Sequence, residues 1–571
     1  MRDKRIRPCL ALAVLLATGN LAAQTNAGIE LAVGDREPIR LQRFGDDVDI
    51  TIDGLVDEGV WTHLEPIGQL VVTTPDTLDE APYATDTRAF YTDAGLYFAF
   101  DMEQPPDTLI ARLTPRDAYD VNRDTIGVTL DTSGNGRYGY WMTMALGDGE
   151  MDGTILPERQ YGRDWDGAWY GATRVTGRGW SAEIFVPWSQ VAMPRTGDSR
   201  RIGVYVSRRV AHLDQRWGWP GLTQTRPRFM SDMQPLDLHG VDPRQQWSIF
   251  PYASGTLDRV DDEARFRAGA DLFWRPSSNF QLTATVNPDF GSVESDNVVV
   301  NLTADETFFP EKRLFFLEGN EIFDVSDREG DNNREPLTVV NTRRIGGRPR
   351  ELELPDGVEL TRRQELKPAD IIAAAKATGQ LGPLRYGVLT ATEDNTDYIA
   401  SNGEYYAVDG RDFGVFRLLY EDSRGAAYRG VGWISTLVAH PEADAVVHGT
   451  DFHLLSTSGK WSMNAQALYS DREETDSGTG FLADMTYTPR QGIEHSLQAS
   501  LLDEHIDVND LGFQVRNNVD DYEYRFRWIR SGLTKIRDFR FSPFLRYGVN
   551  GEGYVVNRGG AISGSLTLNN L

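Results

Sequence analysis

The sequence predicts an all-β protein in which an N-terminal β-sandwich is followed by a transmembrane antiparallel β-barrel. Short strands separated by frequent turns fill the first part of the chain, which is typical of a sandwich. The second part carries about a dozen longer segments in which apolar and polar residues alternate, as barrel strands do. Helical patterns are nearly absent from both parts, and a secretory signal at the start agrees with a barrel outside the cytoplasm.

Length and charge set the outer limits. At 571 residues the chain is too long for one ordinary domain. Hydrophobic residues make up 40% of it, too few for a multi-helix membrane protein, although barrel strands average out to such values. The net charge of −27 argues against a nucleic-acid partner, because phosphate binding needs a basic surface.

Residues 1–23 have the pattern of a signal peptide. A basic start, a short apolar core and the small pair Ala22-Ala23 precede Gln24. The core is much shorter than the roughly 20 residues that a spanning helix needs. Cys9 lies within this segment and is the only cysteine, so we expect an exported mature protein without disulfides.

The sandwich is expected over residues 46–212 and a connector over 213–245. Trp61 and Trp180 end or begin apolar strands and are expected in the core. Trp217 and Trp219 lie in the Pro-rich connector, and we interpret them as residues that seat the sandwich on the rim of the barrel.

The barrel is expected over residues 246–571. The alternation of apolar and polar residues also fits a soluble sheet with one face exposed to water. The export signal and the number of long strands favour the barrel instead. The chain ends in Leu566-Thr-Leu-Asn-Asn-Leu571, whereas such barrels usually finish on a terminal aromatic residue. The barrel is therefore expected to be truncated in this chain or to close differently.

The stretch between Val286 and Phe323 fits neither pattern, because it packs phenylalanines closely among carboxylates. Facing lipid, such charge would cost roughly 2–4 kcal/mol per basic residue at the midplane. We therefore expect it inside the barrel or over its mouth, where it constricts the pore. Its carboxylates are expected to pair locally with Lys312 or Arg313, or with arginines that line the lumen: Arg343, Arg344, Arg525 and Arg527.

Two known families share motifs with the chain. The sandwich resembles the carbohydrate-binding module family 9 fold through four ordered segments: IDGLVDEGVW, YTDAGLYFAFDM, RDTIGVTLDTSGNGRYGYWM and GWSAEIFVPWSQV. Nearly the whole mature chain resembles an uncharacterised bacterial family that joins such a sandwich to an outer-membrane barrel. Its motifs here are NPDFGSVESDNVVVNL, ETFFPEKRLFFLEG, TRRIGG and AAAKATGQLGPLRYGVLTA.

The resemblance implies an outer-membrane protein of a Gram-negative-type envelope that binds carbohydrate through its sandwich and aids glycan uptake or catabolism. One alternative is an O-glycosyl hydrolase that acts on envelope or environmental polysaccharide. A structural envelope protein that binds another protein is the other alternative. The chain has no HExxH, P-loop or nucleophile-elbow motif, so we name no catalytic residues and favour a protein without its own chemistry.

The loop YGRDWDGAWYG is the candidate ligand site. Sugar rings pack on aromatic faces while their hydroxyls need polar partners, and this loop supplies both. We expect contacts from Tyr161, Arg163, Trp165, Asp166 and Trp169, unless one or more of these aromatics belongs to the core.

Two acidic turns, residues 131–136 and 324–335, are candidate calcium sites because calcium prefers oxygen ligands. Neither has EF-hand spacing, and acidic turns are usually just solvated. We therefore expect no cofactor other than this possible calcium.

Overall fold

The protein is described by a computed structural model. It covers residues 36–571, apart from 164, 194–198, 242–245, 259–262, 278, 290–305, 310, 318, 326–327, 329–335, 349–353, 356, 423–427, 474 and 570–571. The predicted signal peptide, including Cys9, lies outside these residues.

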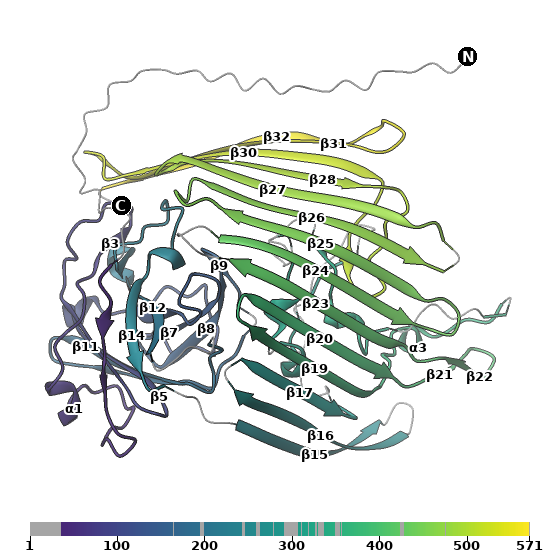
Figure 1. Cartoon of the computed structure of the whole chain (residues 1–571), viewed down its shortest axis with the longest axis horizontal. Coiled ribbons are helices and arrows are strands. Elements are labelled where there is room, and N and C mark those ends of the chain that lie inside the picture. Colours follow the sequence, from purple (N-terminus) through teal and green to yellow (C-terminus); the bar gives the residue numbers. More distant parts are fainter. Residues whose placement is uncertain are drawn as a thin grey trace. The chain divides into compact units, whose positions relative to one another are not determined.

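Two sheets form the N-terminal part of the chain (Figure 1). The larger sheet runs in the order β1-β14-β12-β6-β7-β8-β9. In addition, β13 pairs with β12, and β3 pairs with β13. The smaller sheet runs in the order β10-β11-β5-β4-β2. Their bounds are β1 Ile39–Arg40, β2 Gln42–Arg43, β3 Val71–Thr74, β4 Thr85–Tyr91, β5 Gly95–Glu103, β6 Thr125–Asp131, β7 Gly139–Ala145, β8 Gly149–Leu156, β9 Gln160–Tyr161, β10 Tyr170–Val175, β11 Gly179–Pro187, β12 Ser199–Val210, β13 Gln215–Trp219 and β14 Gln234–His239.

The core of this sandwich lies between the two sheets. Trp180 on β11 and Phe98 on β5 are fully buried there, together with apolar residues of β6, β7 and β12. The opposite face of the smaller sheet is covered by residues 44–64, which include the short helix α1 (Gly59–Thr62). Strand β5 is therefore buried on both faces, which explains why its sequence GLYFAFDME is apolar almost throughout. The core positions predicted for Trp61 and Trp180 are confirmed.

The segment predicted as a connector belongs to the sandwich. Strand β14 pairs with β12 from Ser199↔His239 to Val204↔Gln234, and β13 pairs with the other end of β12. Trp217 is fully buried in the core and Trp219 packs against it, so the rim role expected for these residues is wrong. Burial of a tryptophan removes much apolar area from water, which accounts for their presence in an otherwise Pro-rich segment.

A single 14-stranded antiparallel sheet follows, in which each strand pairs with the next one in the order β15-β16-β17-β19-β20-β23-β24-β25-β26-β27-β28-β30-β31-β32 (Figure 1). The bounds are β15 Gln246–Asp258, β16 Glu263–Ser277, β17 Phe280–Val286, β19 Ile371–Leu381, β20 Leu384–Glu393, β23 Asp412–Asp422, β24 Tyr428–Ala439, β25 Ala445–Leu455, β26 Trp461–Arg472, β27 Gly478–Arg490, β28 Ile493–Leu502, β30 Val519–Ser531, β31 Ile536–Val549 and β32 Val555–Leu568. The all-β fold class is thus confirmed. No helix among the described residues has the length and apolar character to cross a membrane.

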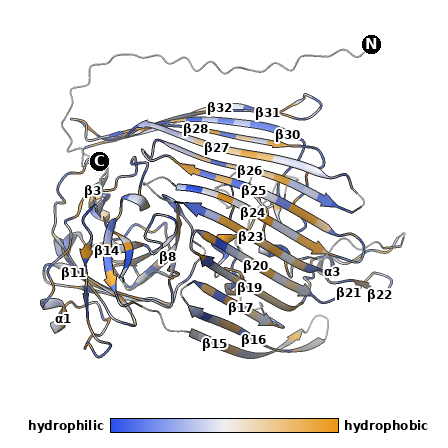
Figure 2. Ribbon diagram, viewed as in Figure 1, coloured by the Kyte–Doolittle hydropathy of each residue, from blue (hydrophilic) through white to orange (hydrophobic). Residues whose placement is uncertain are grey.

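Strand β24 shows how residues alternate across the sheet. Ile434 and Val438 are buried on one face, whereas Val431, Trp433 and Leu437 on the other are 53%, 46% and 43% exposed. Figure 2 shows hydrophobic and hydrophilic positions interspersed along the long strands of this sheet. The exposed face of this sheet differs from the surface of most soluble proteins, because it presents large apolar side chains outward.

The other face is covered by residues 306–347, which we call the inner segment; residues 310, 318, 326–327 and 329–335 within it are not described. It contains the helix α2 (Leu314–Leu317), two 3-10 turns at Asn320–Ile322 and Thr342–Arg344, and the short strand β18 (Leu337–Thr338). Strand β18 pairs with β29 (Phe513–Gln514) from the loop between β28 and β30. Remaining short elements are the helix α3 (Arg362–Glu365) and the hairpin β21 (Thr396–Ile399) with β22 (Tyr405–Val408).

Part of the expected pairing of the inner segment is observed. Arg313 makes a bidentate ion pair with Glu311, and Arg344 binds both carboxylate oxygens of Glu306 at 2.8 Å. Two more of the four predicted arginines pair with strand residues instead: Arg525 with Glu523 and Arg527 with Glu494. Phe315 and Phe316 are buried, as expected for residues packed on the wall; Phe290 lies outside the described residues.

Candidate ligand site on the sandwich

The predicted ligand loop connects the two sheets of the sandwich. It leaves β9 at Tyr161 and enters β10 at Tyr170, so its ends belong to different layers. A loop that crosses between layers needs partners for its own peptide groups, because no sheet pairs them. Asp152 on β8 supplies the central partner.

Asp152 is a fully buried carboxylate on β8, and it holds the loop through hydrogen bonds. Its Oδ2 accepts hydrogen bonds from the Gly167 amide at 2.8 Å and from the Trp169 indole N–H at 2.9 Å. It also receives Nη2 of Arg116 at 2.7 Å. Buried carboxylates persist only with such compensation, so this residue determines where the second half of the loop lies.

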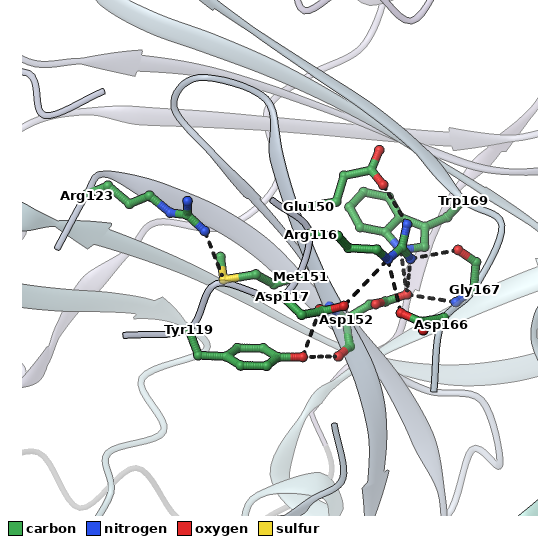
Figure 3. Close-up of polar contacts among 10 residues, drawn as sticks. All are labelled: Arg116, Asp117, Tyr119, Arg123, Glu150, Met151, Asp152, Asp166, Gly167 and Trp169. Carbon is green, nitrogen blue, oxygen red and sulfur yellow. Dashed lines mark hydrogen bonds and ion pairs between the residues drawn. The ribbon is translucent and has the colours of Figure 1, made fainter. Parts of the chain in front are cut away.

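Arg116 lies at the centre of a group of carboxylates (Figure 3). Besides Asp152, its guanidinium binds Glu150 at 2.7 Å and Asp166 at 3.1 Å, and it donates to the carbonyl of Gly167 at 2.9 Å. One arginine thus gathers acidic groups from β8 and from the loop. The predicted residue Asp166 is held at this surface with its side chain 45% exposed.

A second anchor comes from the segment between β5 and β6. The Tyr119 hydroxyl donates to Asp117 at 2.8 Å, and Asp117 accepts the amide of Asp152 at 3.3 Å (Figure 3). The guanidinium of Arg163 stacks over the Tyr119 ring, 4.4 Å from its centroid. The predicted residue Arg163 is exposed, and this cation–π contact holds its guanidinium.

The electrostatics of the cluster follow from burial. Burial raises the pKa of Asp152 to about 6, with the donors of Gly167 and Arg116 offsetting part of the effect. It raises the pKa of Asp117 and of Glu150 as well. The guanidinium of Arg116 neutralises only one of four carboxylates, so the surface keeps a negative charge near neutral pH. Such a surface suits a neutral or cationic ligand that donates hydrogen bonds.

Trp165, the residue before Asp166, supplies the aromatic ring of the loop. The ring is partly buried and packs on Tyr140 of β7, with the centroids 4.7 Å apart. It folds over Gly167, where a Cβ atom would collide with the indole. Gly167 therefore serves two purposes, since its amide anchors the loop and its missing side chain leaves room for the tryptophan.

The remaining two predicted residues lie apart from Trp165. Tyr161 is 44% exposed and contacts Trp141 and Phe229, with centroids 6.2 Å away in both cases. Trp169 is 3% exposed and belongs to the sandwich core, so no ligand can stack on its ring in this conformation. Among the predicted residues, Asp166 binds Arg116, Arg163 stacks on Tyr119 and Trp165 packs on Tyr140, while Trp169 takes a supporting position in the core.

Three residues of the cluster could hold a metal ion. Asp117, Asp152 and Asp166 each offer a carboxylate oxygen, and these atoms lie within 4.8 Å of one another. Oxygen donors are what calcium prefers, but the Arg116 guanidinium already lies among them as a counter-charge.

The acidic turn at residues 131–136 does not need a cation. Both oxygens of the buried Asp131 accept hydrogen bonds from the turn itself, from the Ser133 hydroxyl and the amides of Gly134 and Gly136. Most of the second turn, 324–335, lies outside the described residues. Calcium binding therefore stays a prediction for both.

The sequence analysis did not identify the residues that hold the loop in place. Arg116, Asp117 and Tyr119 lie more than 30 residues before Asp152, and no local motif joins them. The available signal was Asp152 itself, a carboxylate in the middle of the strand GEMDGTIL, which must have a buried partner.

Together these observations define an all-β protein in which a sandwich with an acidic and aromatic loop is followed by a large antiparallel sheet. Residues 243–550 match the family described as "Domain of unknown function (DUF5916)". The match covers more than half of the chain, and the chain therefore belongs to this family. No curated protein matches it.

Solved structures show distant likenesses to the two parts. A carbohydrate-binding module of family 9 from Caldicellulosiruptor kristjanssonii, solved with cellotriose, has 13% sequence identity and a TM-score of 0.26, covering 36% of this chain and 94% of the module. OccK11 (OpdR) of Pseudomonas aeruginosa has 11% identity and a TM-score of 0.23, covering 77% of this chain and 83% of that one. OccK3 (OpdO) of the same organism has 8% identity and a TM-score of 0.20, covering 78% and 96%. TM-scores this low support no conclusion about what this chain binds or where it lies in the cell.

Proposed function

We propose that the protein is exported to the outer membrane and binds carbohydrate through the loop at residues 161–169. The observation that carries the carbohydrate half is a fixed loop in which the partly buried Trp165 ring is followed directly by the half-exposed Asp166 carboxylate, which binds Arg116. A pyranose presents C–H groups to an aromatic ring and hydroxyl donors to carboxylates, and this loop carries both kinds of group.

The membrane half of the proposal is supported by the exposed face of the 14-stranded sheet. Large apolar side chains point outward from six neighbouring strands, β20 and β23 to β27: Val388, Phe416, Tyr420, Val431, Trp433, Leu437, Phe452, Trp461, Tyr469, Phe481 and Met485. Soluble proteins seldom expose an apolar surface this extensive, whereas lipid chains cover it at no cost.

The carbohydrate site is tested by glycan-array binding of the full-length protein in detergent micelles. The wild type is expected to bind at least one glycan class, and Trp165→Ala to weaken that binding roughly tenfold, or about 1.4 kcal/mol. Tyr405→Ala is the matched control, because Tyr405 is an aromatic residue that is 75% exposed on the β21–β22 hairpin. Binding that is absent in the wild type, or equal in Trp165→Ala, contradicts the proposal. Release of reducing ends from a bound glycan would indicate the hydrolase alternative.

A further inference from the structure

A polar cavity of about 330 Å³ lies between the sandwich and the face of the 14-stranded sheet that the inner segment covers. One wall is formed by sandwich residues, among them 156–160 and 226–227, and the other by residues of the strands from β20 to β30. Arg137 of the sandwich binds Glu421 on β23 at 3.3 Å, and both side chains are buried, so the two walls are in direct contact. Small-molecule sites usually have volumes of about 300–1,000 Å³, a range that includes this cavity.

The charges that line the cavity are balanced except at one position. Among the described residues, six arginines line it, and five of these make ion pairs with N–O distances of 2.5 to 3.7 Å. These pairs are Arg137 with Glu421, Arg226 with Asp232, Arg385 with Glu321, Arg417 with Asp451 and Arg527 with Glu494. The sixth is Arg159, which makes no ion pair with any residue that the structure describes.

Arg159 is held in place by neutral groups. Its guanidinium carbon lies 4.1 Å from the centroid of the Phe229 ring, and its Nη2 donates to the carbonyl of Thr223 at 2.5 Å. The preceding residue, Glu158, binds elsewhere, because its carboxylate accepts hydrogen bonds from the amides of Phe229 and Ser231 and from the Ser231 hydroxyl. The guanidinium is therefore fixed at the cavity wall with its charge unpaired.

The unpaired charge of Arg159 is unfavourable in the protein alone. Its Nε is buried without a hydrogen-bond partner, and Nη1 donates to no residue in the described part of the chain. Burial also lowers the pKa of Arg159, because the charged form loses contact with water. Buried charges are normally paired, so this position indicates a partner that comes from outside the chain. A carboxylate is the group that a planar guanidinium binds best, through parallel hydrogen bonds.

We propose that the cavity binds a small organic carboxylate, whose charge pairs with the guanidinium of Arg159. The rest of the ligand meets side-chain amides and hydroxyls of both walls: Gln160, Gln224, Ser462, Asn464, Thr486 and Thr488. A ligand with more negative charge, such as a phosphate dianion, would be repelled by the carboxylates of the lining ion pairs. No described lining residue belongs to the loop at residues 161–169, so the two sites are separate.

The test is isothermal titration calorimetry of the full-length protein in detergent micelles, with acetate, D-gluconate and D-glucuronate as probes and D-glucose as the neutral control. We expect the wild type to bind at least one of these carboxylates about tenfold more tightly than D-glucose. Arg159→Gln keeps a polar side chain near Thr223 but removes the charge, and it should lower that affinity about tenfold or more. Arg178→Gln is the matched control and should bind like the wild type, because Arg178 pairs with Asp101 and Glu103 on the sandwich and its side chain is 68% exposed.

A second variant covers the case in which Arg159→Gln does not fold, as judged by circular dichroism. Ser462→Phe adds a ring to the opposite wall and leaves Arg159 unchanged, and we expect it to weaken carboxylate binding because the ring occupies the space of the ligand. If no carboxylate binds more tightly than D-glucose, or if the folded variants bind it as the wild type does, the site is refuted. Binding that Trp165→Ala abolishes and Arg159→Gln preserves would also refute it, because the ligand would then lie at the loop.

Discussion

Replacement of Arg417 by methionine tests the charged contact behind the inner segment. Arg417 and Asp451 are both fully buried and lie on β23 and β25, on either side of β24. Removing one partner of a buried pair typically costs about 3–5 kcal/mol, because the other charge stays buried. His453 Nε2 lies 2.8 Å from Asp451 Oδ2 and remains as a partner. We therefore expect Arg417→Met to lower the free energy of unfolding by about 3 kcal/mol, the smaller end of this range.

The double variant Arg417→Met/Asp451→Leu separates charge burial from packing. It leaves no unpaired carboxylate, so we expect stability within about 1 kcal/mol of the wild type. The assay is urea denaturation in detergent micelles, followed by loss of the heat-modifiable folded form. A single variant as stable as the double variant would refute this reasoning.

Three further predictions concern the sandwich. Burial raises the pKa of Glu183 to about 7 from 4.5, so the folded state keeps a proton that the unfolded chain releases. The free energy of unfolding should therefore fall by about 3 kcal/mol between about pH 4.5 and pH 7, and Glu183→Gln should remove this slope in urea denaturation. Gly167→Ala should displace the Trp165 ring and weaken glycan binding as Trp165→Ala does; equal binding by Gly167→Ala and the wild type contradicts that packing. Residues 37–241 expressed alone should give a soluble β-rich domain by circular dichroism, whereas residues 46–212 should aggregate because they lack β13 and β14.

The fold class could be predicted because strands leave a period of two in the sequence. The alternation in Trp461, Met463, Ala465 and their neighbours needs no knowledge of distant partners. The core positions of Trp61 and Trp180 followed for the same reason, since each lies next to a recognisable apolar strand. The stretch between Val286 and Phe323 was recognisable because phenylalanines among carboxylates suit neither water nor lipid.

Contacts between residues distant in the sequence were beyond such reasoning. The short strands β13 and β14 owe their existence to pairing with β12, and their prolines suggested a connector instead. The group around Arg116 depends on residues separated by some 35 positions, which only the sheet brings together. Trp169 shows the same limit: its neighbours Trp165 and Asp166 lie at the surface, yet its ring turns into the core to reach Asp152.

The proposed membrane location is measured by cell fractionation. Cells that express the full-length protein are fractionated, and inner and outer membranes are separated by density before gel analysis with and without heating. We expect recovery in the outer-membrane fraction and a folded form that migrates differently until it is boiled, because the apolar face of the sheet requires lipid and its paired strands resist detergent. Recovery as a soluble periplasmic monomer in the absence of detergent would contradict it.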